Sequence, residues 1–387
     1  MNNRENMNKP YYVVLTGSKN NAGDFLIKHR AFKLFKELRS DREIIDLNAW
    51  EAFDKNALEI VNNARALILL GGPALQKNMY PGIYPLVQDL KTISVPITMM
   101  GVGWKSLSGD WSDTRTYDLS STTLNLLERV EADKLLVSVR DYHTLNVLQS
   151  HGLTNGIMTG CPATYDLNFI GSNLTEKANF NKVAFSLGVS FLYSKALDDQ
   201  MKKAVISTKA SFPKAKFEVV FHHGTTEGFL KTPSAKKDHL HGHKKFIEWL
   251  NANNIDYVDI SGSAENLINY YEQCDLHIGY RVHAHIFMNS ISKPSVLIAE
   301  DGRGKALKDV FGGAILNAFD SVGKGILSKI FRRLKIFETF SVSPNLVTEL
   351  EDVVRYEVDK GFPRIAPARS VIDSNFGVMS DYIKNLP

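Results

Sequence analysis

Eleven short apolar runs divide this chain of 387 residues, and they constrain its fold more than any other feature. They lie at 11–17, 43–47, 66–72, 96–104, 135–141 and 157–163, then at 182–190, 217–223, 257–261, 275–280 and 294–300. Runs such as ALILLGG are continuously apolar, which is typical of strands covered on both faces. Segments with a helical period, such as DFLIKHRAFKLFKELRS, separate them. This alternation predicts an α/β fold with parallel sheets.

A polar segment without a clear period, residues 165–181, interrupts the series, and we interpret it as a linker. We predict two Rossmann-like, doubly wound domains that face a central cleft. They cover residues 1–170 and 171–320, and a basic amphipathic and C-terminal helical segment, 321–387, follows them. In open α/β sheets, ligands bind beyond the carboxyl ends of the strands. Candidate site residues are therefore those that directly follow a run.

The composition is that of a globular protein, with 44% apolar and 23% charged residues. A net charge of +4 is too weak to predict a nucleic-acid partner, but it is compatible with anionic ligands. The two cysteines form no disulfide framework, which favours a reducing compartment. The start of the chain has no apolar core of a signal peptide, and no apolar run is long enough to span a bilayer. We expect a cytoplasmic protein.

The stretch CDLHIGYRVHAHIFMNSISKPSVLIAE, residues 274–300, concentrates titratable side chains where a buried strand passes into a helix. Arg281 follows the run, and His283 opens a predicted helix over 282–290. A guanidinium provides fixed positive charge for an anionic substrate, and an imidazole can act as general acid or base. The alternative is that His283 is structural, and we assign His285 to packing.

Further cations follow two other runs. Arg140 closes the run 135–141, and its planar guanidinium fits phosphate or carboxylate; a structural network with Asp141, a predicted helix N-cap, is the alternative. Arg303 and Lys305 follow the run 294–300 and could reach the same anion.

Acidic residues accompany these cations. Glu300 or Asp301 could accept from a hydroxyl group, and the alternative is a capped helix with a solvated charge cluster.

Two glycine-containing turns complete the candidate site. GSKNNAGD contains Asn21, Gly23 and Asp24, and it offers the free N–H groups of a new helix to an anion; alternatively, Asp24 only caps that helix. LLGGPAL contains Gly71 and Gly72, which let a ligand come close, although plain turn geometry would also explain them.

Two basic segments have patterns that would fit other roles. A metal site could be read from the histidines 222, 223, 239, 241 and 243. In HLHGH, residues 239–243, the glycine and the neighbouring lysines favour an exposed, positively charged loop, so we predict no metal site. Residues 323–337, GKGILSKIFRRLKIF, have an apolar stripe opposite basic residues. This pattern indicates either a helix that lies on an anionic membrane or one that packs on the second domain.

The pieces NNAGD, LLGG, GVGW, SVRD followed by HGL, and above all YRVHAH resemble the polysaccharide pyruvyl transferase family in type and order. The resemblance covers roughly residues 12–310 and implies a fold like that of the two-domain GT-B glycosyltransferases. The sequence departs from the family pattern at Pro73, where a third glycine is common. It departs again at AEDGRGKAL, so that Arg303 and Lys305 are uncertain equivalents of family residues.

The resemblance implies transfer of the enolpyruvyl group of phosphoenolpyruvate to a sugar of a surface polysaccharide or its lipid-linked precursor. A pyruvate ketal forms and phosphate is released. Arg140, Arg281, Arg303 and Lys305 would bind the donor, and His283 and Asp24 would be catalytic. Asn21, Gly23, Gly71 and Gly72 would face the acceptor or a phosphate. No cofactor is expected.

Two other functions fit the same architecture. A GT-B glycosyltransferase would use a nucleotide-sugar donor, with Glu300 or Asp301 holding the ribose. A non-enzymatic sugar-binding or assembly protein would keep the cleft without the chemistry.

Overall fold

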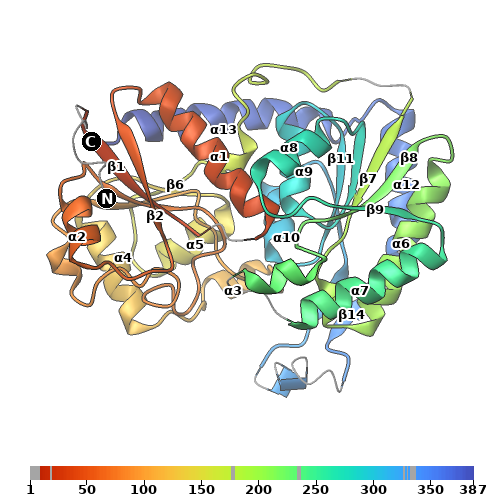
Figure 1. Ribbon diagram of the computed structural model, residues 1–387, viewed down its shortest axis with the longest axis horizontal. Helices are drawn as coiled ribbons and strands as arrows, with labels where there is room; N and C mark the ends of the chain where they lie inside the picture. Colours follow the sequence, from red (N-terminus) through yellow and green to blue (C-terminus); the bar gives the residue numbers. More distant parts are fainter. Residues whose placement is uncertain are drawn as a thin grey trace.

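All eleven predicted strands are present in the computed structural model, which describes residues 9–17, 20–175, 179–232, 237–325, 327–328, 330–331 and 337–387. They form two α/β halves that lie side by side (Figure 1). The first sheet is parallel, with strand order β2-β1-β3-β4, and β5 pairs with β6 beside it. A single bridge between Val102 and Val139 connects the two groups of strands.

The elements of the first half alternate along the chain as the sequence predicted. Its strands are β1 (Tyr11–Thr16), β2 (Glu43–Asn48), β3 (Leu67–Leu70), β4 (Ile97–Met100), β5 (Val137–Val139) and β6 (Gly156–Met158). Its α-helices are α1 (Ala22–Leu38), α2 (Lys55–Asn62), α3 (Trp111–Thr114), α4 (Ser121–Ala132) and α5 (Tyr142–Ser150). Short 3₁₀ helices lie at η1 (Leu90–Thr92) and η2 (Pro162–Thr164).

The second half has a parallel sheet with the order β12-β11-β10-β7-β8-β9. Its strands are β7 (Lys182–Ser186), β8 (Lys216–Phe221), β9 (Asp256–Asp259), β10 (Leu276–Gly279), β11 (Ser295–Ala299) and β12 (Ala314–Asn317). Its helices are α6 (Lys195–Ser211), α7 (Lys237–Ala252), α8 (Ala264–Tyr271), α9 (Val282–Ser290) and α10 (Gly302–Val310), with η3 (Ser190–Leu192) and η4 (Glu227–Lys231). This is the strand order of a Rossmann sheet, and its direction reverses between β7 and β10.

The remaining elements are a hairpin, β13 (Phe319–Val322) and β14 (Phe340–Val342), and the helices α12 (Leu346–Asp359) and α13 (Ala366–Lys384). Helix α12 packs on α6, whereas α13 contacts α1 and α9 and so reaches both halves (Figure 1). One continuous core joins the first half to residues of α8, α9 and α13. The two halves are therefore held together by buried apolar surface as well as by polar contacts.

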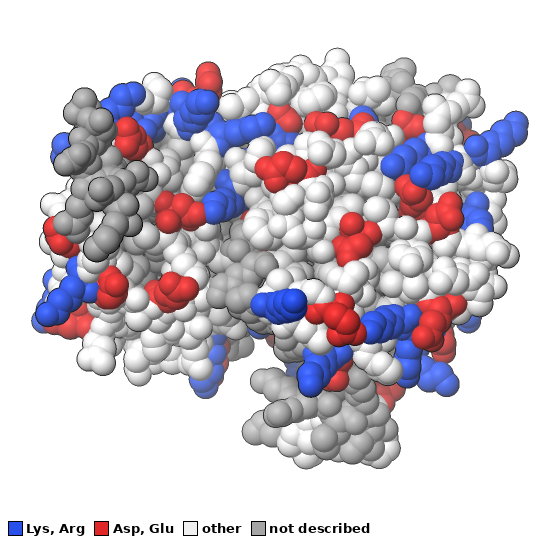
Figure 2. Space-filling view, in the orientation of Figure 1, with Lys and Arg blue, Asp and Glu red and all other residues white. Residues whose placement is uncertain are grey.

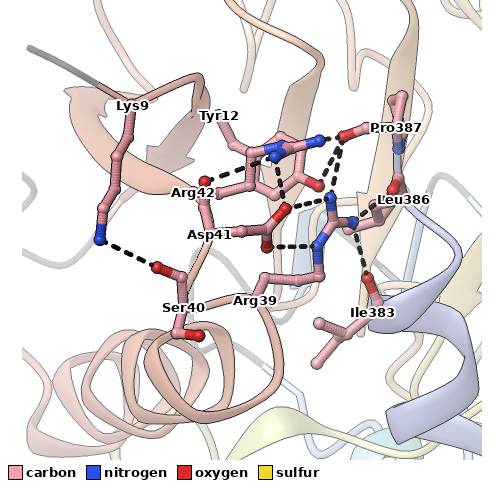
Figure 3. Close-up of polar contacts among 9 residues, drawn as sticks. All are labelled: Lys9, Tyr12, Arg39, Ser40, Asp41, Arg42, Ile383, Leu386 and Pro387. Carbon is pink, nitrogen blue, oxygen red and sulfur yellow. Dashed lines mark hydrogen bonds and ion pairs between the residues drawn. The ribbon is translucent and has the colours of Figure 1, made fainter.

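The end of α13 is fixed to the first half by polar contacts (Figure 3). The hydroxyl of Tyr12 donates to the carbonyl oxygen of Pro387 at 2.7 Å. Arg39 donates to the carbonyl oxygens of Ile383, Leu386 and Pro387, and Asp41 holds its guanidinium. These contacts satisfy carbonyl groups at the helix end that have no partner within the helix.

Three local expectations were wrong. Residues 239–243 belong to α7 rather than to an exposed loop, because Leu240, His243, Phe246 and Leu250 share a buried helical face. The expected linker begins inside the core, where Tyr165 is buried and Asp166 forms an ion pair with Arg30. The residue that caps α1 is Asn21, whose side chain accepts from the N–H of Gly23 at 3.2 Å; Asp24 lies in the first turn.

The prediction for 323–337 lies partly outside the described residues, which do not include 326, 329 and 332–336. Of its apolar residues, Leu327, Ile330 and Phe337 are exposed, by 67%, 43% and 63%. Lys324 binds Asp113 at 2.7 Å and Asp110 at 2.9 Å, across the two halves. This lysine therefore serves contacts within the protein.

Candidate functional site

Residues 274–300, the stretch rich in titratable side chains, lie at the point where the strand order of the second sheet reverses. Arg281 follows β10 directly and is the N-cap residue of α9, and His283 is in the first turn of that helix. The backbone N–H of Arg281 donates to the hydroxyl of Ser186, at the end of β7, at 2.9 Å. Ligands of open α/β sheets bind at this position.

The guanidinium of Arg281 is buried and hydrogen-bonded, and it forms no ion pair with a carboxylate in the described part of the chain. It is 8% exposed, and its Nε donates to the carbonyl oxygen of Leu187 at 2.6 Å. Its Nη2 lies 3.1 Å from Nδ1 of His223. Among the described residues no carboxylate oxygen lies within 4.0 Å of this guanidinium. Burial lowers the pKa of Arg281, and the charge of Glu300 is the largest influence that opposes this shift, although it acts without a direct ion pair. A buried guanidinium that forms no direct ion pair with the described carboxylates can bind an anion from outside.

The first turn of α1 contacts the first turn of α9. A Cβ atom on Gly23 would lie 2.1 Å from Nδ1 of His283, so only glycine leaves room for the imidazole. The adjoining loop is fixed to the second half, because the N–H of Ala22 donates to the carbonyl oxygen of His222 at 3.3 Å. The acidic residue of this turn, Asp24, is thereby brought to the side of the cleft that carries His283.

Arg140 reaches the cleft from the end of β5. Its Nε donates to Asp141 at 3.1 Å, and its Nη2 donates to the carbonyl oxygen of Trp104 at 3.2 Å. Asp141 is also the N-cap of α5, where it accepts from the N–H of Thr144 at 2.7 Å. The predicted structural network of Arg140 with Asp141 is therefore present, and Arg140 stands at the carboxyl end of β5.

Arg303 and Lys305 lie in the first turn of α10, but only one of them joins the cluster. Arg303 forms an ion pair with Asp301 at 2.6 Å, and this pairing raises its pKa. Lys305 places its ammonium 4.7 Å from the ring centroid of Phe319. The charges that act on Lys305 are those of Asp110, Asp320 and Lys324, which are not part of the cluster.

The charges of Arg140, Arg281 and Arg303 act on both His283 and Asp24, so these five residues share one region of the protein. Burial, and to a smaller extent the charges of Arg303, Arg140 and Arg281, lower the pKa of His283 to about 3. Burial raises the pKa of Asp24, and the same three guanidiniums oppose this increase. The three cations therefore surround an imidazole that is neutral near pH 7 and a carboxyl group that holds its proton more tightly than usual.

A cavity of about 250 Å³ adjoins Asp24 at the carboxyl end of the first sheet. Gly71 and Gly72 line it, and both have positive φ angles, +55° and +70°, which let the backbone turn away from the opening. Trp50 and Tyr84 provide aromatic surface in the same cavity. Aromatic surface beside a few polar groups is typical of small-molecule sites.

Sequence reasoning missed two contributors to the site. His223 follows β8 at the carboxyl edge of the sheet, and the rule that identified Arg281 would have found it. Trp50 follows β2 in the same way. Burial lowers the pKa of His223 well below its ordinary range, and the charge of Arg281 lowers it further, so its ring can accept a hydrogen bond from that guanidinium.

The acidic residues considered for ribose binding are already engaged. Asp301 accepts three hydrogen bonds from Arg303, including one from its backbone N–H. Glu300 accepts from the N–H of Val189, at 3.0 Å and 2.9 Å to its two oxygens, and from the N–H of Ser190 at 2.8 Å. Both carboxylates therefore already bind groups of the protein.

Three further observations describe the molecule as a whole. Within the described ranges, no three or more His, Cys, Asp or Glu side chains form a group that could hold a metal ion. No helix in those ranges has the length and apolar character needed to cross a membrane. On the face shown in Figure 2, Lys and Arg are interspersed with Asp and Glu rather than gathered into one basic surface.

Comparison with solved structures identifies the fold class. The structure resembles UDP-GlcNAc 2-epimerase from Neisseria meningitidis with a TM-score of 0.50 and 10% identity, over 97% of this chain and 100% of that one. It resembles S. aureus MnaA, solved with UDP, with a TM-score of 0.52 and 9% identity, over 98% and 99%. For OtsA the TM-score is 0.51 with 10% identity, over 96% and 98%. These likenesses show a GT-B-like fold.

Comparison with protein families gives the finer assignment. The model of the polysaccharide pyruvyl transferase family matches residues 21–302, well over half of the chain. The chain therefore belongs to this family and is a transferase. The comparison with curated proteins gave no match.

Proposed function

We propose that this protein transfers the enolpyruvyl group of phosphoenolpyruvate to a sugar of a surface polysaccharide or its precursor, forming a pyruvate ketal. The observation that carries the proposal is the buried guanidinium of Arg281, which forms no direct ion pair with any described carboxylate and acts on His283 together with Arg140 and Arg303. Phosphoenolpyruvate has a carboxylate and a phosphate close together, so it requires several cations at one place. Guanidinium groups suit both of its anionic groups.

The reaction requires one proton on carbon and the removal of protons from two hydroxyl groups. Protonation of the methylene carbon makes the central carbon electrophilic, and one sugar hydroxyl adds there. Phosphate leaves when its C–O bond breaks, and a second hydroxyl of the same sugar closes the ketal. One of the two hydroxyl protons restores the acid that protonated the methylene carbon, and the other leaves with phosphate. This scheme needs no cofactor.

His283 and Asp24 are the proposed acid and base. Without a donor, the three guanidiniums and burial keep His283 neutral. A bound donor adds negative charge among those guanidiniums, which raises the pKa of the imidazole and lets it carry the proton for the methylene carbon. Asp24, between that cluster and the cavity, would orient the sugar hydroxyl and accept its proton. General acid–base catalysis of this kind typically contributes about 10²–10⁴ in rate.

The acceptor sugar is proposed to occupy the cavity beside Asp24. Trp50 and Tyr84 would supply aromatic surface for the C–H groups of a sugar ring, and the backbone of Gly71 and Gly72 would let the ring approach closely. The ammonium of Lys105 also borders this cavity.

Phosphate release measured with phosphoenolpyruvate and a panel of sugars tests the function. His283→Ala should lower acceptor-dependent release by about 10²-fold or more, with an unchanged circular dichroism spectrum. His241→Ala, which removes an exposed imidazole of the same half, is the matched control and should keep wild-type turnover. Unchanged turnover in His283→Ala would remove this residue from the catalytic role. A wild-type protein that releases no phosphate with any acceptor would favour the non-enzymatic alternative.

A glycosyltransferase that uses a nucleotide-sugar donor is the second candidate, because its architecture is the same. The engagement of Glu300 and Asp301 within the protein counts against it, since both carboxylates already accept hydrogen bonds from the protein. Thermal stabilisation by phosphoenolpyruvate, compared with that by UDP-sugars, distinguishes the two.

Peripheral contact with the inner face of the plasma membrane is also proposed, through the segment 323–337. Leu327, Ile330 and Phe337 are exposed apolar residues in a segment whose sequence also contains several lysines and arginines. Such contact would keep the enzyme near a lipid-linked acceptor.

A further inference from the structure

The turn after β7, residues 187–190, holds an internal carboxylate in an unusual place. In a Rossmann sheet the turn after the first strand offers its backbone N–H groups to the diphosphate of a nucleotide. Strand β7 is the first strand of the second sheet, because the order β12-β11-β10-β7-β8-β9 reverses beside it. Here the N–H groups of Val189 and Ser190 donate to the carboxylate of Glu300.

The fit between this carboxylate and the turn is close. Glu300 is 5% exposed. A Cβ atom on Gly188 would lie 2.3 Å from its Oε2, so any larger residue would displace it. The hydroxyl of Ser190 is buried in the same turn without a hydrogen-bond partner. The turn therefore has donors for an anion, and the protein itself supplies the anion.

The same turn also orients the cation of the donor site. Arg281 donates from Nε to the carbonyl oxygen of Leu187 at 2.6 Å. Glu300 thus holds the N–H side of the turn while Arg281 holds its carbonyl side. Without the carboxylate of Glu300, the N–H groups of the turn would lose their acceptor. The turn that positions the guanidinium of Arg281 would then no longer be held in place.

We propose that Glu300 is a specificity-determining residue, whose carboxylate takes the place of a nucleotide diphosphate in this turn. It excludes nucleoside diphosphates and nucleoside diphosphate sugars, because it occupies the N–H groups that would bind the diphosphate and because its negative charge repels that group. It also positions Arg281 for a smaller donor with one phosphate and one carboxylate. The positioning role rests on the proposed function, whereas the exclusion of diphosphates does not.

The experiment measures binding of inorganic pyrophosphate, UDP and phosphoenolpyruvate to the purified full chain by calorimetry. Wild-type protein should bind phosphoenolpyruvate and neither of the two diphosphates. Glu300→Ala should gain binding of pyrophosphate and UDP, tighter than wild type by about tenfold or more, because charge-assisted hydrogen bonds to the turn become available. Its affinity for phosphoenolpyruvate should fall by about tenfold, because Arg281 is no longer fixed.

Asp275→Ala is the matched control. Asp275 is a buried carboxylate that accepts from the N–H groups of Asn181 and Lys182, at 2.7 Å and 3.1 Å, at the opposite end of β7. Its removal also leaves two backbone donors without their acceptor, but it should change no anion affinity. Glu300→Gln keeps the shape and loses the charge, so it serves if the alanine variant does not fold, and it should bind diphosphates more tightly than wild type.

The outcomes separate the inference from the proposed function. Wild-type binding of UDP or pyrophosphate as tight as that of the variants would overturn the inference, and so would variants that gain no diphosphate binding. If the variants gain diphosphate binding while no form binds phosphoenolpyruvate, the proposed donor is wrong and Glu300 still excludes diphosphates.

Discussion

His283 shows how burial sets the chemistry of a single residue. Its pKa in the folded protein is about 3, below the ordinary value of 6.5. As the pH falls, the unfolded chain therefore takes up the proton first. Between about pH 6.5 and pH 3 the free energy of unfolding should fall with falling pH, by up to about 1.4 kcal/mol per pH unit for this side chain. Below that window both states carry the proton, and the contribution no longer changes.

Urea unfolding at several pH values checks this expectation. His283→Gln should be less sensitive to acid than wild type, because a side chain that cannot be protonated replaces the imidazole. Other buried histidines with a lowered pKa, such as His243 at about 4 and His285 at about 3, keep part of the pH dependence in the variant. Parallel pH profiles for wild type and variant would show that the environment of His283 differs from the one described.

At the scale of elements, the contact between the first turns of α1 and α9 sets the distance between the proposed acid and base. Gly23→Ala should lower turnover by about 10²-fold, because the new Cβ atom would lie 2.1 Å from Nδ1 of His283 and the ring must move. Alanine favours a helix more than glycine does, by about 1 kcal/mol, so stability need not fall to the same extent.

A helical glycine in α13 provides the control for this variant. A Cβ atom on Gly377 would meet no atom within 4 Å. Gly377→Ala should therefore leave turnover unchanged, as measured by the same phosphate-release assay. Full activity in Gly23→Ala would show that the two helix ends are not in close contact in solution.

At the scale of the whole molecule, the described residues between β13 and β14 project away from the second half (Figure 1). Co-sedimentation at low salt should show binding to vesicles with anionic lipid and weaker binding to zwitterionic vesicles. The double variant Leu327→Glu/Phe337→Glu should lose most of this binding, because both side chains are exposed apolar groups. Ile206→Glu, at another exposed apolar residue on α6, should keep it. No binding of the wild-type protein at low salt would end this proposal.

The sequence determined the class of fold because the signal is local. Runs such as 66–72 and 294–300 form strands with buried residues on both faces, which is why they are continuously apolar. The helix predicted for 282–290 is present with those bounds. Strand β12 and the hairpin of β13 and β14 were not predicted, and partly exposed residues make their patterns weak.

The candidate site could be predicted in part for the same reason. Arg140 directly follows β5, and Arg281 and His283 come within four residues of the end of β10. The rule that ligands bind at the carboxyl ends of strands therefore predicts a position at the cleft for all three. The same rule placed Lys305 there, but its ammonium packs over Phe319 instead. The rule fixes where a backbone segment lies, and the rotamer of a long side chain depends on neighbours that are distant in the sequence.

The sequence by itself determined which residues stand at the ends of strands and that the chain alternates strand and helix, because both depend on neighbours within a few positions. Only the tertiary structure decided which charges meet. Packing pairs Arg303 with Asp301, and it brings Glu300 to a turn more than a hundred residues earlier in the chain. Packing also leaves Arg281 without a direct ion pair to any carboxylate of the described residues. Burial then sets the proton affinity of His283 and Asp24, since the cost of a charge depends on the water that the folded chain excludes.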